Sequence, residues 1–396
     1  MSSALHLERL DTYVVALPAR RPHLWVGIDT PAGSGYVVTR VTLSNGVVGW
    51  GEAQVIKTWG GDNQRRYGET PATTVTLIRE YLVPALRGVD VRQFEQVHAA
   101  MNRSLRGYPY AKAAVEVALF DAVGKSLGVP VHQLLGGKVR DKVELAHSIG
   151  LMEIDVAVDE AKRVVAEGIN TLKVKIGVGL ERDVAMVAAI RKAIGDAPKI
   201  RVDANQGYKS WREALQAVKR MEHYNIVYAE QMVDGVAGLA EISQRCDVPV
   251  MADESAWTDR DVIDIARQGA AQFLSVYYTK PGGLLPAKRL LAVAGALQMQ
   301  CDINGSGEMG VGNAANLHLA ASSPEICLPG TIPVTSTAEI VRTQVAGHKY
   351  LDDIIVTPFE YEDGFLKVPD GPGLGIEVDE GKLRRYAIAL NSAALN

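Results

Sequence analysis

The stretch from Thr171 to Gly283 decides the fold, because five short apolar runs follow one another in it at regular intervals. They have the sequences TLKVKIG (171–177), IRVDANQGY (200–208), VYAEQM (227–232), PVMADES (249–255) and FLSVYYTKPGG (273–283). The polar residues that follow the apolar part of each run lie 28, 27, 23 and 24 residues apart, counted from Lys175. That is the spacing of a strand, a helix and two loops, so the stretch predicts neighbouring strands of a parallel sheet.

The same alternation continues on both sides of this stretch. Eight candidate strands begin near positions 143, 171, 200, 227, 249, 273, 299 and 326, with helical segments between them. Strands that alternate with helices indicate a parallel sheet, and eight of them over roughly 190 residues favour a TIM-like α/β barrel over an open sheet. In such a barrel the chemistry lies where strands end, which is where the carboxylates and lysines of the stretch are found.

The segments outside the barrel have a different pattern. Residues 5–53 alternate apolar and polar positions around the turn Asn45-Gly46, which is typical of antiparallel strands, and residues 71–128 have helical periodicity. The turn-rich tail is expected to leave the barrel and pack against this first unit. The predicted domains are therefore an α+β capping domain (1–130), a barrel (131–365) and a C-terminal segment (366–396) that returns to the capping domain.

Composition excludes several classes of protein. The 396 residues carry a net charge of −4, which disfavours a nucleic-acid partner or an anionic membrane surface. No apolar run approaches the length that a membrane span needs, and the charged N-terminus lacks the apolar core of a signal peptide, so we expect a cytoplasmic protein. The three cysteines are too few and too scattered for a disulfide framework.

Three acidic residues follow consecutive strands of the predicted barrel. Asp203, Glu230 and Asp253 each come after an apolar strand core, so they should meet at one rim. Without a cation they would repel one another, and a hard divalent ion with oxygen ligands resolves that conflict. We therefore expect Mg²⁺, with Mn²⁺ as the alternative. The competing interpretation is that each acid only caps the helix that follows it.

Two lysines lie two positions apart on the strand before these acids. Lys173 and Lys175 should point to the same face, and helices cover the outer face of a barrel, so both are expected in the interior. Adjacent ammonium groups lower one another's pKa, which would provide a general base near neutral pH.

A glycine-rich segment, GSGEMGVG (305–312), contains a formal G-x-G-x-x-G pattern. A dinucleotide site would make the chain an NAD-dependent oxidoreductase, but Glu308 inside the loop would repel a pyrophosphate. The pattern also occurs late in the series instead of opening it. We favour a turn that carries Glu308 to the barrel rim as a candidate catalytic residue.

Motifs along nearly the whole chain resemble the enolase superfamily, in particular its muconate-lactonizing-enzyme and mandelate-racemase branch. The matching segments are GWGEA (49–53), AKAAVEVALFDAVGKSLGVPVHQLLGG (111–137), LKVKIG (172–177), VDANQGY (202–208), AEQ (229–231), ADES (252–255), KPGG (280–283) and DGPGLGIEVDEGKL (370–383). The resemblance implies an N-terminal capping domain and a modified (β/α)₇β barrel. It also implies Mg²⁺ held by Asp203, Glu230 and Asp253, with Lys175 as the base and Lys173 beside it.

The chemistry implied by the resemblance is removal of the proton α to a carboxylate, through an enediolate. Sites of this superfamily are a known example of a lysine or histidine base acting with Mg²⁺. The sequence departs from the pattern at Tyr277, which stands where the lactonizing enzymes have a second catalytic lysine, while Lys280 matches their non-catalytic lysine. Period-two parity would turn Lys280 away from the face that Tyr277 shares. The seventh strand offers Asp302 and no histidine.

This departure decides how the possible reactions are ranked. A neutral tyrosine is a poor base at pH 7, which disfavours a two-base racemase or epimerase. We expect a muconate-cycloisomerase-like isomerase, with a dehydratase of acid sugars or hydroxy acids as the main alternative. In the dehydratase, Tyr277 would act as general acid, and simple packing of its ring is the competing interpretation. A homologue that binds metal without catalysis is a further alternative.

Two polar, aromatic-bearing loops of the capping domain, at 20–31 and 55–67, have the length of functional loops, and mobile surface is the competing interpretation. The resemblance implies that they close over the site and select a small carboxylate substrate. The candidate substrate-binding residues are His23, Trp25, Trp59, Asn205 and Asp302, and the second loop also carries Asn63, Arg65, Arg66 and Tyr67. The resemblance further implies a homo-oligomer, either a dimer or an octamer.

Overall fold

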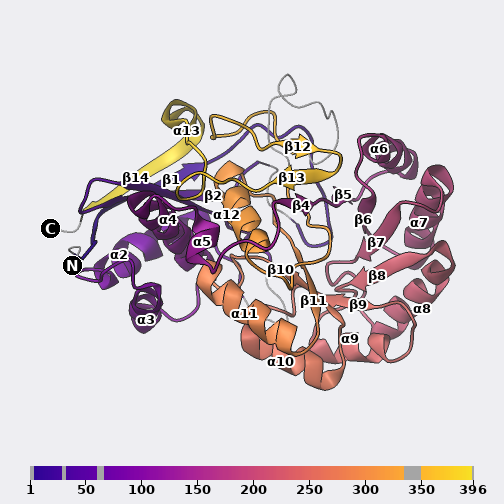
Figure 1. Ribbon diagram of the computed structural model, residues 1–396. Coiled ribbons are helices and arrows are strands. Elements are labelled where there is room, and N and C mark those ends of the chain that lie inside the picture. Colours follow the sequence, from indigo (N-terminus) through magenta and orange to yellow (C-terminus); the bar gives the residue numbers. More distant parts are fainter. Residues whose placement is uncertain (1–3, 29–32, 60–66, 334–348, 395–396) are drawn as a thin grey trace.

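The computed structural model describes residues 4–28, 33–59, 67–333 and 349–394. Figure 1 shows two units side by side, a small antiparallel sheet with helices against it and a curled parallel sheet with helices along its outer side. Of the residues expected to select substrate, Asn63, Arg65 and Arg66 lie outside the described ranges.

The first unit is built on an antiparallel sheet with the strand order β14-β1-β2-β3. Its elements are β1 (Leu7–Val15), β2 (Tyr36–Leu43), β3 (Val48–Gln54), α1 (Pro71–Leu77), η1 (Ile78–Leu82), α2 (Val83–Ala85), α3 (Phe94–Ser104), α4 (Pro109–Leu127) and α5 (Val131–Leu134). As predicted, β2 and β3 form a hairpin across Asn45-Gly46, where Gly46 has a positive φ of 80°.

The apolar helix α4 packs against β3 with almost no space between their backbones. A Cβ atom at Gly49 would lie 2.2 Å from the carbonyl oxygen of Ala118, and one at Gly51 would lie 2.1 Å from that of Ala114. Glycine is therefore required at both positions of the GWGEA motif. Glu52 follows Gly51 on β3, and its side chain reaches the second unit. Its carboxylate accepts hydrogen bonds from the backbone N–H groups of Met309 (2.7 Å) and Gly312 (2.8 Å) at the start of α12.

The second unit contains a parallel sheet with the strand order β5-β6-β7-β8-β9-β10-β11. Its strands are β5 (His147–Ile149), β6 (Thr171–Lys175), β7 (Lys199–Asp203), β8 (Ile226–Glu230), β9 (Val250–Ala252), β10 (Phe273–Val276) and β11 (Gln300–Ile303). The helices are α6 (Ile154–Ala166), α7 (Leu180–Ile194), α8 (Trp211–Met221), η2 (Glu222–Tyr224), α9 (Val236–Ser243), α10 (Asp259–Gln268), α11 (Leu284–Ala296) and α12 (Gly310–Ala321). The strands are almost entirely buried, as expected for a sheet with helices on its outer face.

The first and last of the eight predicted strands differ from expectation. The segment at 143 divides: β4 (Lys142–Glu144) pairs outside the barrel with β13, and the first barrel strand is β5. The segment at 326 makes isolated parallel bridges, Cys301 with Ile326 and Leu145 with Gly330, which join the two edges of the sheet. Pro329 has no N–H group to donate to a neighbouring strand, and its carbonyl oxygen accepts a hydrogen bond from the Arg201 guanidinium. Regular strand pairing therefore stops at Pro329.

The C-terminal segment returns to both units. The hairpin of β12 (Tyr361–Glu362) and β13 (Phe365–Lys367) adds to β4, and α13 (Glu380–Tyr386) leads into β14 (Ala387–Ala394). β14 pairs with β1, so the first and the last strand lie side by side on the small unit, at the left of Figure 1. The boundaries at 130/131 and 365/366 stay a prediction.

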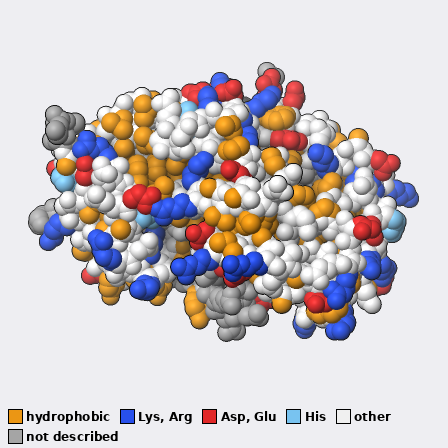
Figure 2. All heavy atoms as spheres, turned by 60° about the horizontal axis from the view of Figure 1, so that its bottom comes forward, with side chains coloured by type: hydrophobic (Ala, Val, Ile, Leu, Met, Phe, Trp, Pro, Cys, Tyr) orange, Lys and Arg blue, Asp and Glu red, His pale blue; other side chains and the backbone are white. Residues whose placement is uncertain are grey.

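The surface shows no concentration of one charge on the face displayed in Figure 2, where basic and acidic side chains are interspersed. This agrees with the small net charge of −4. Among the helices of the described ranges, none combines the length and the apolar character needed to cross a bilayer.

Candidate active site

The carboxyl ends of three neighbouring strands lie in one line across the parallel sheet. Lys175 at the end of β6 is in register with Asp203 at the end of β7, and Asp203 is in register with Glu230 at the end of β8. Asp253 follows β9 directly, at the same rim. All four residues are buried, so the spacing seen in the sequence corresponds to a real cluster of charges.

Lysine ammonium groups neutralise these carboxylates. Lys173 Nζ lies 2.9 Å from Asp203 Oδ2 and 2.7 Å from Glu230 Oε1, and Lys280 Nζ lies 2.7 Å from Asp253 Oδ1. Period-two parity was wrong for Lys280, since β10 ends at Val276 and the turn that follows brings Lys280 back to the rim beside Tyr277. Gly282 and Gly283, with φ of 97° and 141°, permit that turn.

The expected lowering of the Lys173 pKa by Lys175 does not occur. Burial lowers the pKa of Lys173, but the carboxylates of Asp203 and Glu230 outweigh burial and hold this pKa above its ordinary value. Burial raises the pKa of Asp203, and Lys173 and Lys175 more than reverse that rise. Lys173 is thus a fixed positive charge at the rim, which is unsuitable for a base.

Lys175 is held differently from Lys173, because it binds one carboxylate and one amide where Lys173 binds two carboxylates. Its Nζ donates to Asp203 Oδ2 and to Asn205 Oδ1, both at 2.6 Å, and lies 5.6 Å from the centre of the Trp25 ring. Asn205 has a positive φ of 43°, in a tight turn after β7 that points its amide at Lys175. The Asn205 amide nitrogen in turn donates to Glu254 Oε1 at 2.9 Å.

The acidic cluster suits a hard cation in its chemistry. Burial, and next the neighbouring Asp203 carboxylate, raise the pKa of Glu230 well above its usual range, and its Oε2 atom is buried without a hydrogen-bond partner. A buried carboxylate oxygen without a hydrogen-bond partner can act as a ligand for a hard cation. Within the described ranges, no three His, Cys, Asp or Glu side chains lie close enough to form a group that could hold an ion. Lysine ammonium groups bind Glu230 Oε1 and Asp203 Oδ2 in this structure. The donor set fits Mg²⁺ once an ion competes with these lysines.

Tyr277 borders the same rim. Its hydroxyl donates to Asp253 Oδ2 at 3.3 Å, its ring lies 5.1 Å from that of Trp59, and Lys280 Nζ lies 4.6 Å from its ring centre. Burial, followed by the Asp253 and Glu230 carboxylates, raises the pKa of Tyr277 well above its ordinary value of 10.0. The hydroxyl therefore stays protonated and can serve only as a donor.

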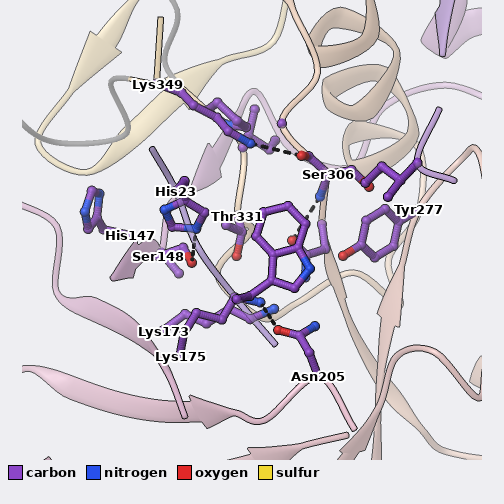
Figure 3. A pocket seen from close by; sticks show the side chains of 18 of the residues that line it. His23, His147, Ser148, Lys173, Lys175, Asn205, Tyr277, Ser306, Thr331 and Lys349 are labelled. Atoms are coloured by element: carbon purple, nitrogen blue, oxygen red, sulfur yellow. Dashed lines mark hydrogen bonds between the residues drawn. The ribbon is translucent and has the colours of Figure 1, made fainter. Parts of the chain in front are cut away.

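A cavity of about 90 Å³ lies above this rim, and its wall includes side chains from the loops of the capping domain (Figure 3). Its wall contains the predicted residues Lys173, Lys175, Asn205, Tyr277, His23, Trp25 and Trp59. His23 Nε2 pairs with Ser148 Oγ at 3.1 Å, and burial, followed by the nearby Lys349 and Lys175 charges, lowers the pKa of His23 well below 6.5. His23 is consequently neutral at physiological pH.

The predicted metal ligands Asp203, Glu230 and Asp253 do not themselves line this cavity, and neither do two other predicted residues, Asp302 and Glu308. The Asp302 carboxylate is buried in the barrel interior and pairs with Arg201 Nη1 at 3.1 Å. Glu308 is buried at the turn before α12, where its Oε2 accepts the Gly307 N–H at 3.2 Å. The start of α12 already has the Glu52 carboxylate bound to its N–H groups, which leaves no place for a pyrophosphate.

Two residues of the wall, Ser148 and Lys349, and one residue behind it, Glu254, were not predicted from the sequence. Ser148 lies within β5, in register with Lys173 of β6, and could have been found once β5 was placed correctly. Glu254 lies in the ADES motif, beneath Trp59 and Asn205, and burial followed by Asp253 raises its pKa to about 8. Lys349 belongs to no motif or periodic segment, so the sequence held no signal for it.

Two family models match the chain over most of its length. One, described as enolase C-terminal domain-like, matches residues 156–382, and the other, the mandelate racemase / muconate lactonizing enzyme N-terminal domain, matches residues 9–136. The chain belongs to this family of the enolase superfamily. The resemblance inferred from the motifs is confirmed, and so is the predicted class of fold.

Several characterised relatives align with this chain over nearly its full length. The chain is 29% identical to the N-succinyl-L-Arg/Lys racemase of Bacillus cereus over 98% of both chains, and the crystal structure of that racemase has a TM-score of 0.88, covering 98% of this chain and 100% of that one at 27% identity. It is 32% identical to muconate cycloisomerase 1-1 of Acinetobacter lwoffii, over 97% of both. It is 31% identical to the L-Ala-D/L-Glu epimerase of Bacillus subtilis, over 94% of this chain and 97% of that one.

These relatives are all enzymes, and this chain is an enzyme of the same superfamily. Abstraction of a proton α to a carboxylate fits the rim of lysines and carboxylates described above. Membership of the family implies a divalent metal, typically Mg²⁺.

Proposed function

We propose that Lys175 removes the proton α to a substrate carboxylate, and that the enzyme is a muconate-cycloisomerase-like isomerase. The observation that carries the proposal is the position of the Lys175 ammonium in the cavity wall, held at 2.6 Å by Asp203 and by Asn205. These two contacts fix the position of Nζ, which would accept the α-proton as the amine, after Lys175 has released one of its own protons. The charge that develops on the enediolate meets the Lys173 ammonium at the same rim.

We also propose that Asp203, Glu230 and Asp253 hold Mg²⁺. The buried Glu230 oxygen without a partner supports this assignment. When bound, the ion would act as a Lewis acid toward the substrate carboxylate. His23, Trp25 and Trp59 would cover the substrate and exclude water, since they contribute to the wall on the capping side.

The second candidate is a dehydratase, and Tyr277 is the observation that favours it. Its hydroxyl lines the cavity, and in this candidate it would protonate the leaving hydroxyl group of a β-hydroxy acid, against the raised pKa that burial gives it. The bond to that hydroxyl would break as water leaves, and Tyr277 would recover its proton from solvent. The two candidates share the first step at Lys175 and differ in the product, because only the dehydratase product is lighter by one water.

The test is a screen in deuterated water with Mg²⁺, against muconates, hydroxy acids and N-acylated amino acids. NMR follows exchange of the α-proton, and mass spectrometry distinguishes an isomer from a dehydrated product. We expect at least one acid to exchange with the native enzyme, no exchange with Lys175→Ala, and native exchange with Lys209→Ala, which alters an exposed lysine away from the cavity. Exchange that survives Lys175→Ala would refute the assignment.

The assembly of the chain stays a prediction as well. We expect a homo-oligomer, a dimer or an octamer, and light scattering during size-exclusion chromatography would measure it.

A further inference from the structure

One side of the cavity wall ends in a lysine that has no place in the proton-abstraction machinery. Lys349 Nζ donates to the backbone carbonyl of Ser306 at 2.9 Å, and the ammonium faces the cavity. Figure 3 shows Lys349 and Ser306 at one side of the cavity and Lys173, Lys175 and Asn205 at the other. The cavity therefore has two positive poles.

Both ammonium groups lie near the indole ring of Trp25. Lys175 Nζ lies 5.6 Å from the centre of this ring, and Lys349 Nζ lies 5.9 Å from it. The cavity wall also contains the apolar side chains of Ile56, Trp59 and Ile332, beside polar ones such as Ser148 and Thr331. A ligand that spans the cavity would thus meet an ammonium group at each end and apolar side chains along the wall.

Lys349 differs from the other cations of the wall in its partners. Lys173 and Lys175 bind carboxylates of the rim, and Arg21 and His147 both bind Glu160. Within the described ranges of the chain, no carboxylate lies at ion-pair distance from Lys349. Glu308 is the nearest acid that influences it, and the Oε2 atom of Glu308 is bound to the Gly307 N–H instead.

The turn between β11 and α12 makes room for this ammonium. A Cβ atom at Gly307 would lie 1.7 Å from Lys349 Nζ, and Gly307 has a positive φ of 111°. A side chain at position 307 would therefore force the Lys349 ammonium to shift from its present position. Partial burial of the ammonium is unfavourable without a counter-charge, and it lowers the pKa of Lys349 to about 8.

We propose that Lys349 is a specificity-determining residue, which binds a negatively charged group at the end of the substrate remote from Lys175. The assignment rests on the proposed function, in that Lys175 defines the reacting end. A carboxylate brought to Lys349 would replace missing hydration with a charge-assisted hydrogen bond. The substrate class is then a carboxylic acid with a second anionic group across an apolar spacer, and monocarboxylic acids are poor ligands.

The test compares matched ligands by isothermal titration calorimetry at pH 7 with Mg²⁺: glutarate against pentanoate, and adipate against hexanoate. The native enzyme should bind the better dicarboxylate about tenfold or more tightly than its monocarboxylate partner. Lys349→Met should bring that ratio close to one, and Lys349→Arg should retain more of it than Met does. Lys209→Met, the exposed control, should leave it unchanged.

Two results would overturn the proposal: a native ratio near one, or a ratio that Lys349→Met leaves within twofold of native. If the Met variant does not fold, as judged by circular dichroism, Gly307→Ala offers a second route, since it should displace the ammonium and lower the ratio. Failure of the proposed function can be distinguished from failure of the Lys349 assignment. Lys175→Ala should abolish exchange of the α-proton yet keep the dicarboxylate preference, and a native enzyme without exchange but with the preference would refute only the role of Lys175.

Discussion

The hydroxyl of Tyr277 and the ammonium of Lys280, three positions apart on one turn, hold opposite oxygens of the same carboxylate. Tyr277 donates to Asp253 Oδ2 at 3.3 Å, and Lys280 binds Asp253 Oδ1 at 2.7 Å. The residue that occupies the place of a second catalytic lysine is therefore tied to a proposed metal ligand. Its contribution can be separated from that of Lys175 by experiment.

Tyr277→Phe removes one hydroxyl and keeps the ring that packs on Trp59. For an isomerase we expect exchange of the α-proton to fall by less than about tenfold, because Lys175 still performs the abstraction. For a dehydratase we expect exchange to persist while release of dehydrated product falls by about a hundredfold or more. Comparing both rates in one reaction, by NMR and mass spectrometry, distinguishes the two.

Removal of divalent ions should affect both activity and stability. Dialysis against EDTA should abolish exchange of the α-proton, and Mg²⁺ at about 100 times its dissociation constant should stabilise the fold by about 2.7 kcal/mol. Thermal unfolding measures the second effect without any substrate. Glu230→Gln should lose the Mg²⁺-dependent rise in melting temperature, whereas Glu362→Gln, at an exposed position, should keep it. A rise that is unchanged in Glu230→Gln would contradict the ligand assignment.

The preference for dicarboxylates should depend on pH through Lys349. Its pKa is lowered to about 8, chiefly by burial, with Glu308 opposing and Lys175 assisting that shift. A lysine is charged below its pKa, so the preference should be complete near pH 6.5 and should decline as the pH rises past 8. His23 faces the same space but stays neutral throughout this range. In Lys349→Arg the decline should vanish, because a guanidinium stays protonated; calorimetry at each pH provides the measurement.

Asp302 should prove important for stability. Asp302 and Arg201 are fully buried, and Asp302→Ala would leave the Arg201 guanidinium without its carboxylate, at a cost of about 3–5 kcal/mol. Asp264→Ala, which alters an exposed ion pair with Arg267, should cost about 1 kcal/mol or less. Denaturant unfolding measures both. If Asp302→Ala kept native stability and lost ligand binding, the original assignment of Asp302 to the substrate would return.

Gly51→Ala tests the contact between β3 and α4. The added methyl group would lie 2.1 Å from the Ala114 carbonyl, so the helix must shift, and overpacking of this kind typically costs about 1–3 kcal/mol. Gly179→Ala is the matched control, since a Cβ atom there has no neighbour within 4 Å. The difference between their melting temperatures gives the cost of the close approach.

The rim of the barrel could be predicted from the sequence because its residues follow strands of regular spacing. Lys175, Asp203 and Glu230 end consecutive strands, and parallel pairing alone brings them into line. Asp302 was misplaced because it lies within β11, one residue before its end, and points to the barrel interior where Arg201 binds it. Strand spacing locates a residue along the sheet, but the face it occupies depends on where the strand ends.

Residues beyond the strands could not be placed in this way. Lys280 returns to the rim only because a turn with two positive-φ glycines follows β10. Lys349 comes from the chain after the last barrel segment, and its place depends on the space left at Gly307. Such contacts arise from tertiary packing between distant segments, for which neither periodicity nor local propensity gives a signal.

The hydrogen bonds from Met309 and Gly312 to Glu52 determine how substrate selectivity can change in this enzyme. They fix the end of β3 against the start of α12, so the segments that carry His23, Trp25 and Trp59 extend from an anchored frame. New loop sequences between β1 and β2, or after β3, could therefore alter ligand choice without loosening the junction between the units. Transplanting those two segments from a relative, with Glu52 left intact, is the economical way to redesign this catalyst.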